Sequence, residues 1–312
     1  MSTTATTVGS LPRYDFARVL DDSLRANWRL EDVASTGVAL DFAKPFLPES
    51  LSQTERLDFL APKERLALNH VRSNAYLAIF GLVEEFILPF ILDHARPSLS
   101  DDDARTRALL QFAGEEAKHI ALFRGFAGEF ERGFGSRCGV IGPAADIGKA
   151  VLAHDPLGVA LAILQIEWMT QRHWLEAARD DGALDPRFKG LLRFHWAEES
   201  QHAKLDTLMV EALAAGRSKE EIARGFDAYL AIGAFIDGGL AAQVELDLAS
   251  FELATGRTLD AAERARFLDE QRRANRFTYL VSGMTHPRFR ATVESLGGDL
   301  LARLDQAIES LS

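Results

Sequence analysis

Apolar residues recur three and four positions apart along most of the chain, which is the spacing of one face of an α-helix. No segment alternates between apolar and polar residues in the manner of a half-buried strand. The pattern therefore predicts an all-α protein. The expected helices cover residues 14–26, 62–94, 100–132, 156–179, 186–216, a segment that starts at 218, 259–282 and 287–308.

Local signals at the helix ends divide this series into two pairs of long helices. Pro62 stands where a first helical turn accepts proline, and Ser218-Lys-Glu-Glu has the spacing of a capping box. Between the two pairs lies GFGSRCGVIGPAADIG, residues 133–148, which is typical of a long connection. Two helices, a long crossover and two more helices are the connectivity of a ferritin-like four-helix bundle. We expect this bundle with additional N- and C-terminal helices, a disordered segment at 1–12 and a single domain at 13–312.

Composition and charge narrow the classes of partner. The chain has 312 residues, of which 47% are hydrophobic and 26% charged, as is typical of a soluble globular protein. Its formal net charge of -11 argues against nucleic acid and anionic membranes as partners. The single cysteine, Cys138, excludes an intrachain disulfide framework. The first residues lack the features of a signal peptide, and the nearest candidate for a membrane span is interrupted by Glu84 and Glu85, so we expect a cytoplasmic protein.

Three residues of the stretch FHWAEESQHAKLD share one helical face. His195, Glu199 and His202 stand at positions i, i+4 and i+7, in a segment whose neighbours are apolar enough for a buried helix. An isolated buried carboxylate costs several kcal/mol unless a partner compensates it. Because a metal ion is the partner that two imidazoles and a carboxylate have in common, the stretch predicts a metal site.

A second long helix carries the same Glu-x-x-His spacing, at Glu116 and His119. The two pairs lie in apolar helices on either side of the long connection. In a di-metal carboxylate bundle, each of the other two helices supplies one inward-facing glutamate. The third long helix offers Glu167, and the first offers Glu84 or Glu85.

The choice between the two adjacent glutamates depends on which side of the first helix faces solvent. Arg65, Asn69 and Arg72 cluster on one side, which we expect to be the solvent side. At about 100° per residue, Glu85 lies nearly opposite this cluster, whereas Glu84 lies farther from the inward direction. We therefore expect Glu85 as the ligand and keep Glu84 as the alternative.

The ligand types indicate which metals would bind. Four carboxylates can neutralise and bridge two divalent ions, while the imidazoles complete the coordination of each ion. Oxygen-rich sites with a few imidazoles suit iron or manganese, and the absence of thiolates disfavours structural zinc. We expect two iron ions; manganese or a mixed pair is also compatible with these ligands.

Further carboxylates are spaced to support the ligands. Glu115 and Glu198 each stand four residues before a proposed ligand histidine, a spacing at which a carboxylate can accept a hydrogen bond from an imidazole N–H. Asp206, four residues after His202, could do the same. The alternative is that all three are solvated charges on helix faces. His195 has an alternative too, as a buried structural histidine bonded to a backbone carbonyl.

The eight-residue pattern His-x-x-x-Glu-x-x-His at His195, Glu199 and His202 resembles the p-aminobenzoate N-oxygenase family of di-iron enzymes. The resemblance covers roughly residues 60–290 and implies the ferritin-like fold. It implies that His195 is an additional iron ligand, so that the site has three histidines and four carboxylates. The implied ligands are Glu85 (or Glu84), Glu116, His119, Glu167, His195, Glu199 and His202.

We therefore expect an enzyme, a non-haem di-iron oxygenase that uses O2 as co-substrate to oxidise a small organic molecule, with N-oxygenation of an amine as the leading reaction. The alternatives are hydroxylation, desaturation or oxidative C–C cleavage on the same scaffold, or a ferroxidase or other iron-handling protein. The sequence has no flavin or Fe–S motif, so electrons must come from an external donor. We expect no nucleic-acid or membrane partner and leave a homodimer open.

Overall fold

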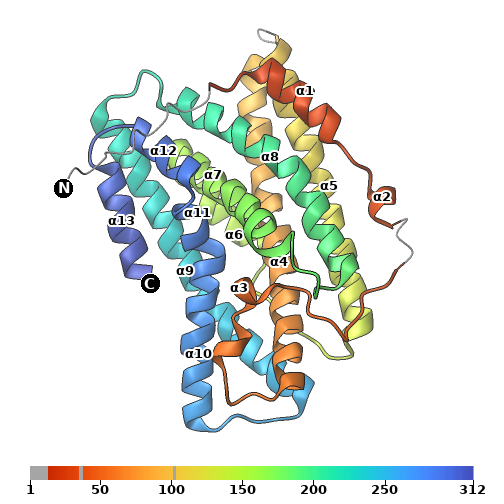
Figure 1. Cartoon of the computed structure of the whole chain (residues 1–312). Coiled ribbons are helices and arrows are strands. Elements are labelled where there is room, and N and C mark those ends of the chain that lie inside the picture. Colours follow the sequence, from red (N-terminus) through yellow and green to blue (C-terminus); the bar gives the residue numbers. More distant parts are fainter. Residues whose placement is uncertain (1–12, 35–37, 101–102, 312) are drawn as a thin grey trace, which may run out of the picture.

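Four long helices form the centre of the molecule: α4 (Pro62–Ala95), α5 (Asp103–Phe134), α7 (Pro156–Arg172) and α8 (Pro186–Ala214). In this computed structural model α4 packs against α5 and α7 packs against α8, and α8 also contacts α5 (Figure 1). The crossover from α5 to α7 separates the two pairs. This connectivity is that of a ferritin-like four-helix bundle, so the predicted fold class is confirmed.

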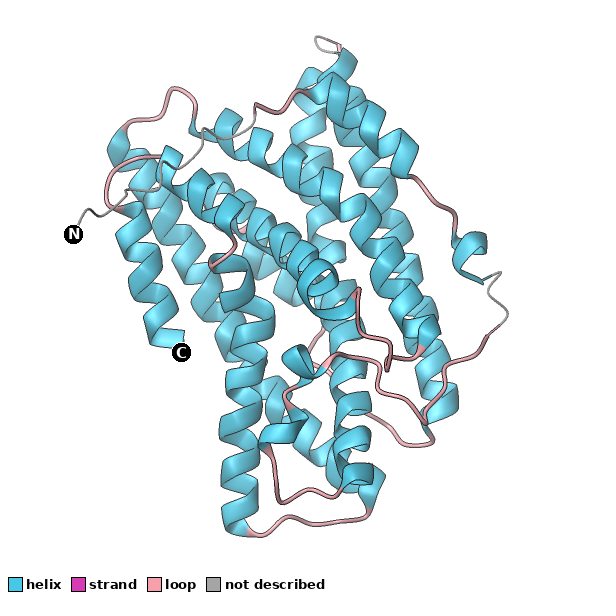
Figure 2. Cartoon of the chain, in the orientation of Figure 1, coloured by secondary structure: helices cyan, strands magenta, loops and turns pink. Residues whose placement is uncertain are grey.

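The structure describes residues 13–34, 38–100 and 103–311, and these ranges contain helices and no strand (Figure 2). The predicted disordered segment 1–12 lies outside the described residues. The other helices are α1 (Phe16–Ala26), α2 (Leu30–Ala34), α3 (Glu49–Ser52), α6 (Ala144–Leu152), α9 (Lys219–Thr255), α10 (Ala261–Arg276), α11 (Ser282–Met284), α12 (Pro287–Ser295) and α13 (Leu300–Leu311). Short 3-10 turns occur at η1 (Thr54–Arg56) and η2 (Arg96–Ser98), and π-helical turns at η3 (His173–Ala178) and η4 (Phe277–Val281).

Caps fix where the bundle helices begin. Proline occupies the first turn of α4, α7 and α8, where its missing N–H is not needed. Asp155 accepts a hydrogen bond from the backbone N–H of Leu157 at the start of α7, and Asp185 accepts one from Phe188 at the start of α8. The predicted capping box at Ser218 and Glu221 opens α9.

Two predicted segments differ from the structure. The connection over 133–148 is not wholly irregular, because its last residues start α6 at Ala144. The single helix expected over 287–308 is two helices, α12 and α13. Gly297 and Gly298, with φ of 84° and 69°, lie between them in the left-handed region, which interrupts an α-helix.

The helices outside the bundle cover two of its sides. α1 lies across α5 and α8, and α9 packs against α7 and α4 on the opposite side of the molecule (Figure 1). Glycine permits the close approach of α7 and α9: a Cβ at Gly158 would lie 2.7 Å from Ala228 Cβ and 2.8 Å from the carbonyl oxygen of Gly225.

Within the described ranges, two helices are long and apolar enough to cross a membrane by length and composition alone. These are α4, extended by the turn that follows it, and α9. Most of the apolar window of α4 is buried inside the protein, as in the core helix of a bundle, and α4 carries the buried carboxylate of Glu84 there.

Candidate metal centre

Seven titratable side chains from the four bundle helices are buried at the centre of the bundle. Each of the seven residues is at most 2% exposed. They are Glu84 from α4, Glu116 and His119 from α5, Glu167 from α7, and His195, Glu199 and His202 from α8. The structure thus brings together the side chains that the sequence pattern pointed to, with Glu84 in the position expected for Glu85.

Six of these residues form two overlapping groups of potential ligand atoms. One atom from each of Glu84, His119, His195 and Glu199 lies within 4.8 Å of the others. The second group is Glu116, His119, Glu199 and His202, with the same limit. Glu167 adjoins both groups, because its carboxyl group interacts with that of Glu199. Two shared residues place the groups side by side, as in a site for two neighbouring ions.

The atoms at the centre lack hydrogen-bond partners. His119 Nδ1 lies 2.9 Å from Glu199 Oε1, and His202 Nδ1 lies 2.9 Å from Glu116 Oε1, yet none of these four atoms has a partner in hydrogen-bond geometry. One oxygen of Glu84 and one of Glu167 also have no partner. Buried polar atoms are normally satisfied, so such a convergent set of orphaned lone pairs fits metal ions.

The electrostatics of the cluster call for cations. Burial raises the pKa of Glu84 well above its usual value, and the charges of Glu116 and Glu199 raise it further. Burial also raises the pKa of Glu167, and the charge of Glu199 adds to this effect. Burial opposes ionisation of Glu116 too, but the neighbouring carboxyl group of Glu84 and the charge of His202 lower its pKa to about 2. Two divalent ions would balance all four carboxylates and displace the protons that they otherwise share.

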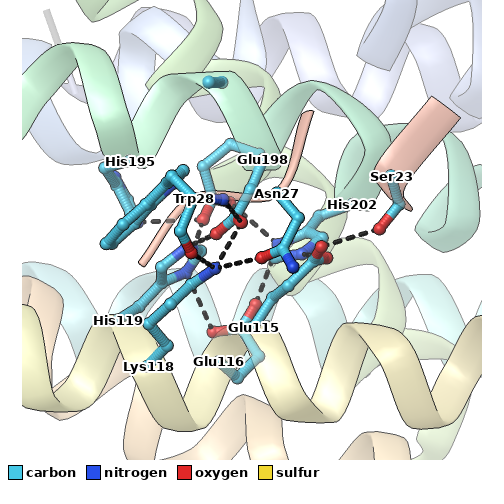
Figure 3. A network of polar contacts seen from close by, with 12 residues as sticks. Ser23, Asn27, Trp28, Glu115, Glu116, Lys118, His119, His195, Glu198 and His202 are labelled. Carbon is cyan, nitrogen blue, oxygen red and sulfur yellow. Dashed lines mark hydrogen bonds and ion pairs between the residues drawn. The ribbon is translucent and has the colours of Figure 1, made fainter. Parts of the chain in front are cut away.

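The outer nitrogen of each Glu-x-x-His histidine is bonded to a carboxylate of the facing helix. His119 Nε2 on α5 lies 2.9 Å from Glu198 Oε2 on α8, and His202 Nε2 on α8 lies 2.9 Å from Glu115 Oε2 on α5 (Figure 3). An Nε2–H that donates outward leaves the Nδ1 lone pair free for a metal. These supporting carboxylates were expected from the sequence, but the expected pairing within one helix is wrong. The imidazoles extend away from their own helix, so their outer nitrogens reach the opposite one.

Asp206 is buried but does not support His202 as expected. Both of its carboxylate oxygens lack a hydrogen-bond partner among the described residues, and His202 Nε2 bonds Glu115 instead. Burial raises the pKa of Asp206 well above its usual value, against the opposing charge of His202.

The expectation for the first helix is corrected to its alternative. The side chain of Glu85 is 34% exposed, and its Oε1 pairs with Arg124 Nη2 at 2.6 Å. Glu84 Oε1 instead lies 3.0 Å from His195 Nε2. The helical-face argument failed because Asn69 and Arg72 do not face solvent.

Both of those polar residues are buried and bonded within the protein. Asn69 Oδ1 accepts the backbone N–H of Phe46 at 2.8 Å. Arg72 Nη1 donates to Gln271 Oε1 at 2.9 Å and to Asn275 Oδ1 at 2.8 Å. The polar side of α4 therefore contacts the segment around Phe46 and helix α10, and it does not face solvent.

The N-terminal segment contributes residues to the site that the sequence did not reveal. Ser23 of α1 donates a 2.7 Å hydrogen bond to Glu115 Oε1. Lys118 Nζ pairs with Glu198 and donates to the backbone oxygen of Trp28 at 2.8 Å (Figure 3). The Trp28 ring is stacked beside His119, with centroids 6.0 Å apart. In the sequence, the one sign of these contacts is Lys118, which directly precedes the candidate ligand His119 in an apolar helix. Its position does not indicate which residue it pairs with.

An apolar cavity of about 440 Å³ adjoins the cluster. It lies between α4, α6, α7 and α9, and its walls include Phe80, Val151, Ile166 and Leu240. The Phe80 ring also packs edge-on against the His195 ring, with centroids 5.6 Å apart. One aromatic side chain therefore contacts both the cavity and the histidine.

Comparison with known proteins finds solved structures with a similar fold but low sequence identity. No protein-family model matches the chain, and no curated protein matches it. Among solved structures, tyrosine-to-phenylalanine variants of an R2-like ligand-binding oxidase with anaerobically and aerobically reconstituted Mn/Fe cofactor each have 15% sequence identity and a TM-score of 0.47. Each alignment covers 85% of this chain and 93% of the other.

Proposed function

We propose that the protein is a di-iron enzyme that uses O2 to oxidise a small organic molecule. The observation that carries this proposal is the convergence of four carboxylates and three imidazoles, with orphaned lone pairs, on one buried point of the bundle. Such a set is expensive to bury without cations, and its oxygen-rich composition with a few imidazoles suits iron or manganese.

The residues divide into two sets of ligands. Glu116 and His202 would hold one ion, and Glu84 and His195 the other, with Glu199 and His119 lying within reach of both groups. Glu167 would complete the site through its contact with Glu199. Two bound iron ions would supply the redox chemistry toward O2 that no side chain of the protein can supply.

The surrounding residues position the ligands and exclude water. Glu198 and Glu115 hold the Nε2–H groups of His119 and His202, which fixes the ring orientation of both. The Phe112 ring stacks on His202 with centroids 3.9 Å apart, and Trp28 covers His119. A dry site keeps reactive oxygen species away from bulk solvent and strengthens the electrostatic interactions within it.

N-oxygenation of an amine is the reaction that we favour. The support is the resemblance of His195, Glu199 and His202 to the N-oxygenase pattern, together with the position of His195. Its Nε2 lies 3.0 Å from Glu84 Oε1 and 2.9 Å from Glu199 Oε1, at the cluster and not at a backbone carbonyl. Hydroxylation, desaturation and C–C cleavage would use the same ligands, with electrons from an external donor in each case.

The apolar cavity favours an organic substrate over iron storage. A ferroxidase needs a polar route for ions to the metal site, whereas the cavity beside Phe80 is lined mainly by apolar side chains. Iron handling is therefore the less favoured function.

Iron content and oxygen consumption test the proposal. The anaerobically loaded protein should bind two ferrous ions per chain and consume O2 with a change in its absorption spectrum. Glu116→Ala should lose two-ion occupancy, because it removes an anion from a buried site. A Glu116→Ala protein that still holds two irons per chain, or a wild-type chain that holds none, would contradict the proposal.

His195→Ala tests the additional imidazole. Four carboxylates and two histidines remain, so the variant should keep two irons, but its spectrum after exposure to O2 should change in position or lifetime. If His195 is only structural, the variant should lose stability and show an unaltered spectrum, and the N-oxygenase resemblance would lose its most specific support.

A further inference from the structure

The walls of the cavity come from six parts of the chain, one of which is η4 with Tyr279. Helices α4, α6, α7 and α9 supply most of its lining, and Val140, Ile141 and Gly142 of the crossover cover it. Ile141 is held there because its backbone N–H donates to Gln243 Oε1 of α9 at 2.9 Å. A volume of about 440 Å³ is within the usual range for small-molecule sites.

The lining contains no charged side chain among the described residues, and Tyr279 is its one side chain with a hydroxyl group. Burial raises the pKa of Tyr279, so this hydroxyl stays neutral at physiological pH. A charged ligand would lose its hydration here without gaining a counter-ion. The lining therefore selects against carboxylate-bearing and cationic molecules.

The cavity approaches the metal cluster at one end and reaches the surface at the other. Phe80 lines the inner end, where its ring packs edge-on against the ring of His195. At the other end Val140 and Phe235 are 43% and 44% exposed. A molecule could therefore enter between the crossover and α9 and lie with one end toward the metals.

We propose that this cavity is the substrate site and that it takes an uncharged, mainly apolar molecule with a single polar group toward Tyr279. Phe80, between the cavity and His195, is the residue that positions the substrate relative to the metals. The inference rests on the proposed function for its chemistry, but the binding that it requires can be measured separately.

Two fluorescent probes with one skeleton test the selectivity. N-phenyl-1-naphthylamine is neutral, and 8-anilinonaphthalene-1-sulfonate carries the same rings with a sulfonate. The iron-loaded protein should bind the neutral probe at least about a hundredfold more tightly, since only the charged probe must bury an unpaired ion. Equal affinity for the two probes would overturn the inference without the need for any variant.

Two neighbouring glycines of α9 locate the binding. A Cβ at Gly239 would lie 3.7 Å from Ile141 Cδ1, inside the cavity wall, whereas a Cβ at Gly238 would have no atom within 4 Å. Gly239→Phe should fill the cavity and weaken binding of the neutral probe by about tenfold or more. Gly238→Phe, with the same change in helix propensity, should leave binding unchanged. Equal effects of the two substitutions would place the probe elsewhere and overturn the inference.

Iron content separates this inference from the proposed function. Gly239→Phe should keep two irons per chain, because the glycine lies outside the cluster. A protein that binds two irons and reacts with O2, but does not bind the neutral probe in this cavity, would leave the di-iron function standing and refute the substrate site. A protein that binds the probe in the cavity but binds no iron would refute the di-iron function and leave the cavity as a binding site for neutral molecules.

Discussion

Adjacent glutamates on α4 occupy opposite environments. Successive residues on a helix are about 100° apart, so two neighbours can face the core and the surface. Glu84 is buried against His195, whereas Glu85 pairs with Arg124 at the surface. Glu84 and Glu85 therefore allow a direct comparison between a candidate ligand and a surface charge of the same residue type.

Replacing each of the two by alanine should separate their roles. Glu84→Ala should reduce bound iron to one ion or fewer per chain, because it removes an anion from one of the two ligand groups. Glu85→Ala loses only an exposed ion pair and should retain two irons and nearly unchanged stability. Metal analysis after dialysis measures both. A loss of iron in Glu85→Ala with retention in Glu84→Ala would return the ligand to the position first expected from the sequence.

Another buried carboxylate, Asp247 of α9, lies outside the metal cluster. Its Oδ1 accepts a hydrogen bond from Gln243 Nε2 at 2.8 Å, and its Oδ2 has no partner. Burial raises its pKa to about 7, although the charge of Arg72 and the bond from Gln243 oppose the shift. Between about pH 4 and 7 the folded chain therefore holds a proton that the unfolded chain releases.

The free energy of unfolding should consequently fall across this range because of Asp247. Its contribution is fully present below about pH 4 and is lost as the pH rises toward 7. Asp247→Asn removes this dependence, so the stability of the variant relative to wild type should increase by about 2–3 kcal/mol between pH 5 and 8. Urea unfolding at the two pH values measures the difference. The exposed Asp21→Asn serves as control, and a flat difference for Asp247→Asn would mean that the carboxyl is ionised in the folded protein.

At the scale of helices, features that depend on local sequence could be predicted, and features that depend on contacts between helices could not. The starts of α4, α7, α8 and α9 were predictable because proline and capping residues act locally. The Glu-x-x-His pairs also identified the cluster, since spacing on one helix is a local property. The inward glutamate of α4 and the partners of Glu115 and Glu198 were not predictable, because they depend on which other helix lies opposite. A single sequence does not contain that information in any local pattern.

The crossing of α7 and α9 should be sensitive to a single methyl group. Gly158→Ala places a Cβ within 2.7 Å of Ala228 Cβ, closer than carbon atoms pack, so one helix must move. We expect a loss of about 1–3 kcal/mol in the free energy of unfolding. Gly190→Ala, on α8 with no atom within 4 Å, should instead be neutral or stabilising by up to about 1 kcal/mol. Chemical denaturation of both variants gives the comparison, and equal effects would show that the α7–α9 contact is not tight.

At the scale of the whole molecule, the cluster links metal binding to folding. The ligands come from all four bundle helices, so only the folded chain assembles the site. A ligand that binds only the folded state raises its stability by about 2.7 kcal/mol at a free concentration one hundred times the dissociation constant. Metal occupancy should therefore determine the stability of the entire bundle.

Removal of iron should lower the melting temperature of the wild-type protein by several degrees or more. Calorimetry with and without iron, at matched pH and ionic strength, measures this shift. Glu116→Ala should melt at the same temperature under both conditions, because it cannot assemble the two-ion site. Identical melting temperatures for wild type with and without iron would argue against metal binding in the bundle.

The exchange of carboxylates between α5 and α8 has a consequence for how the sequence can change over evolution. Glu115 of α5 accepts the hydrogen bond from His202 of α8, and Glu198 of α8 accepts the one from His119 of α5. Each helix therefore supplies the carboxylate that orients the histidine of the other. A shift of one helix by a single turn would break both bonds together, and loss of either glutamate is felt on the opposite helix. Among descendants of this chain, positions 115 and 202 should therefore change together, as should 198 and 119, although 87 and 79 residues separate the members of these pairs.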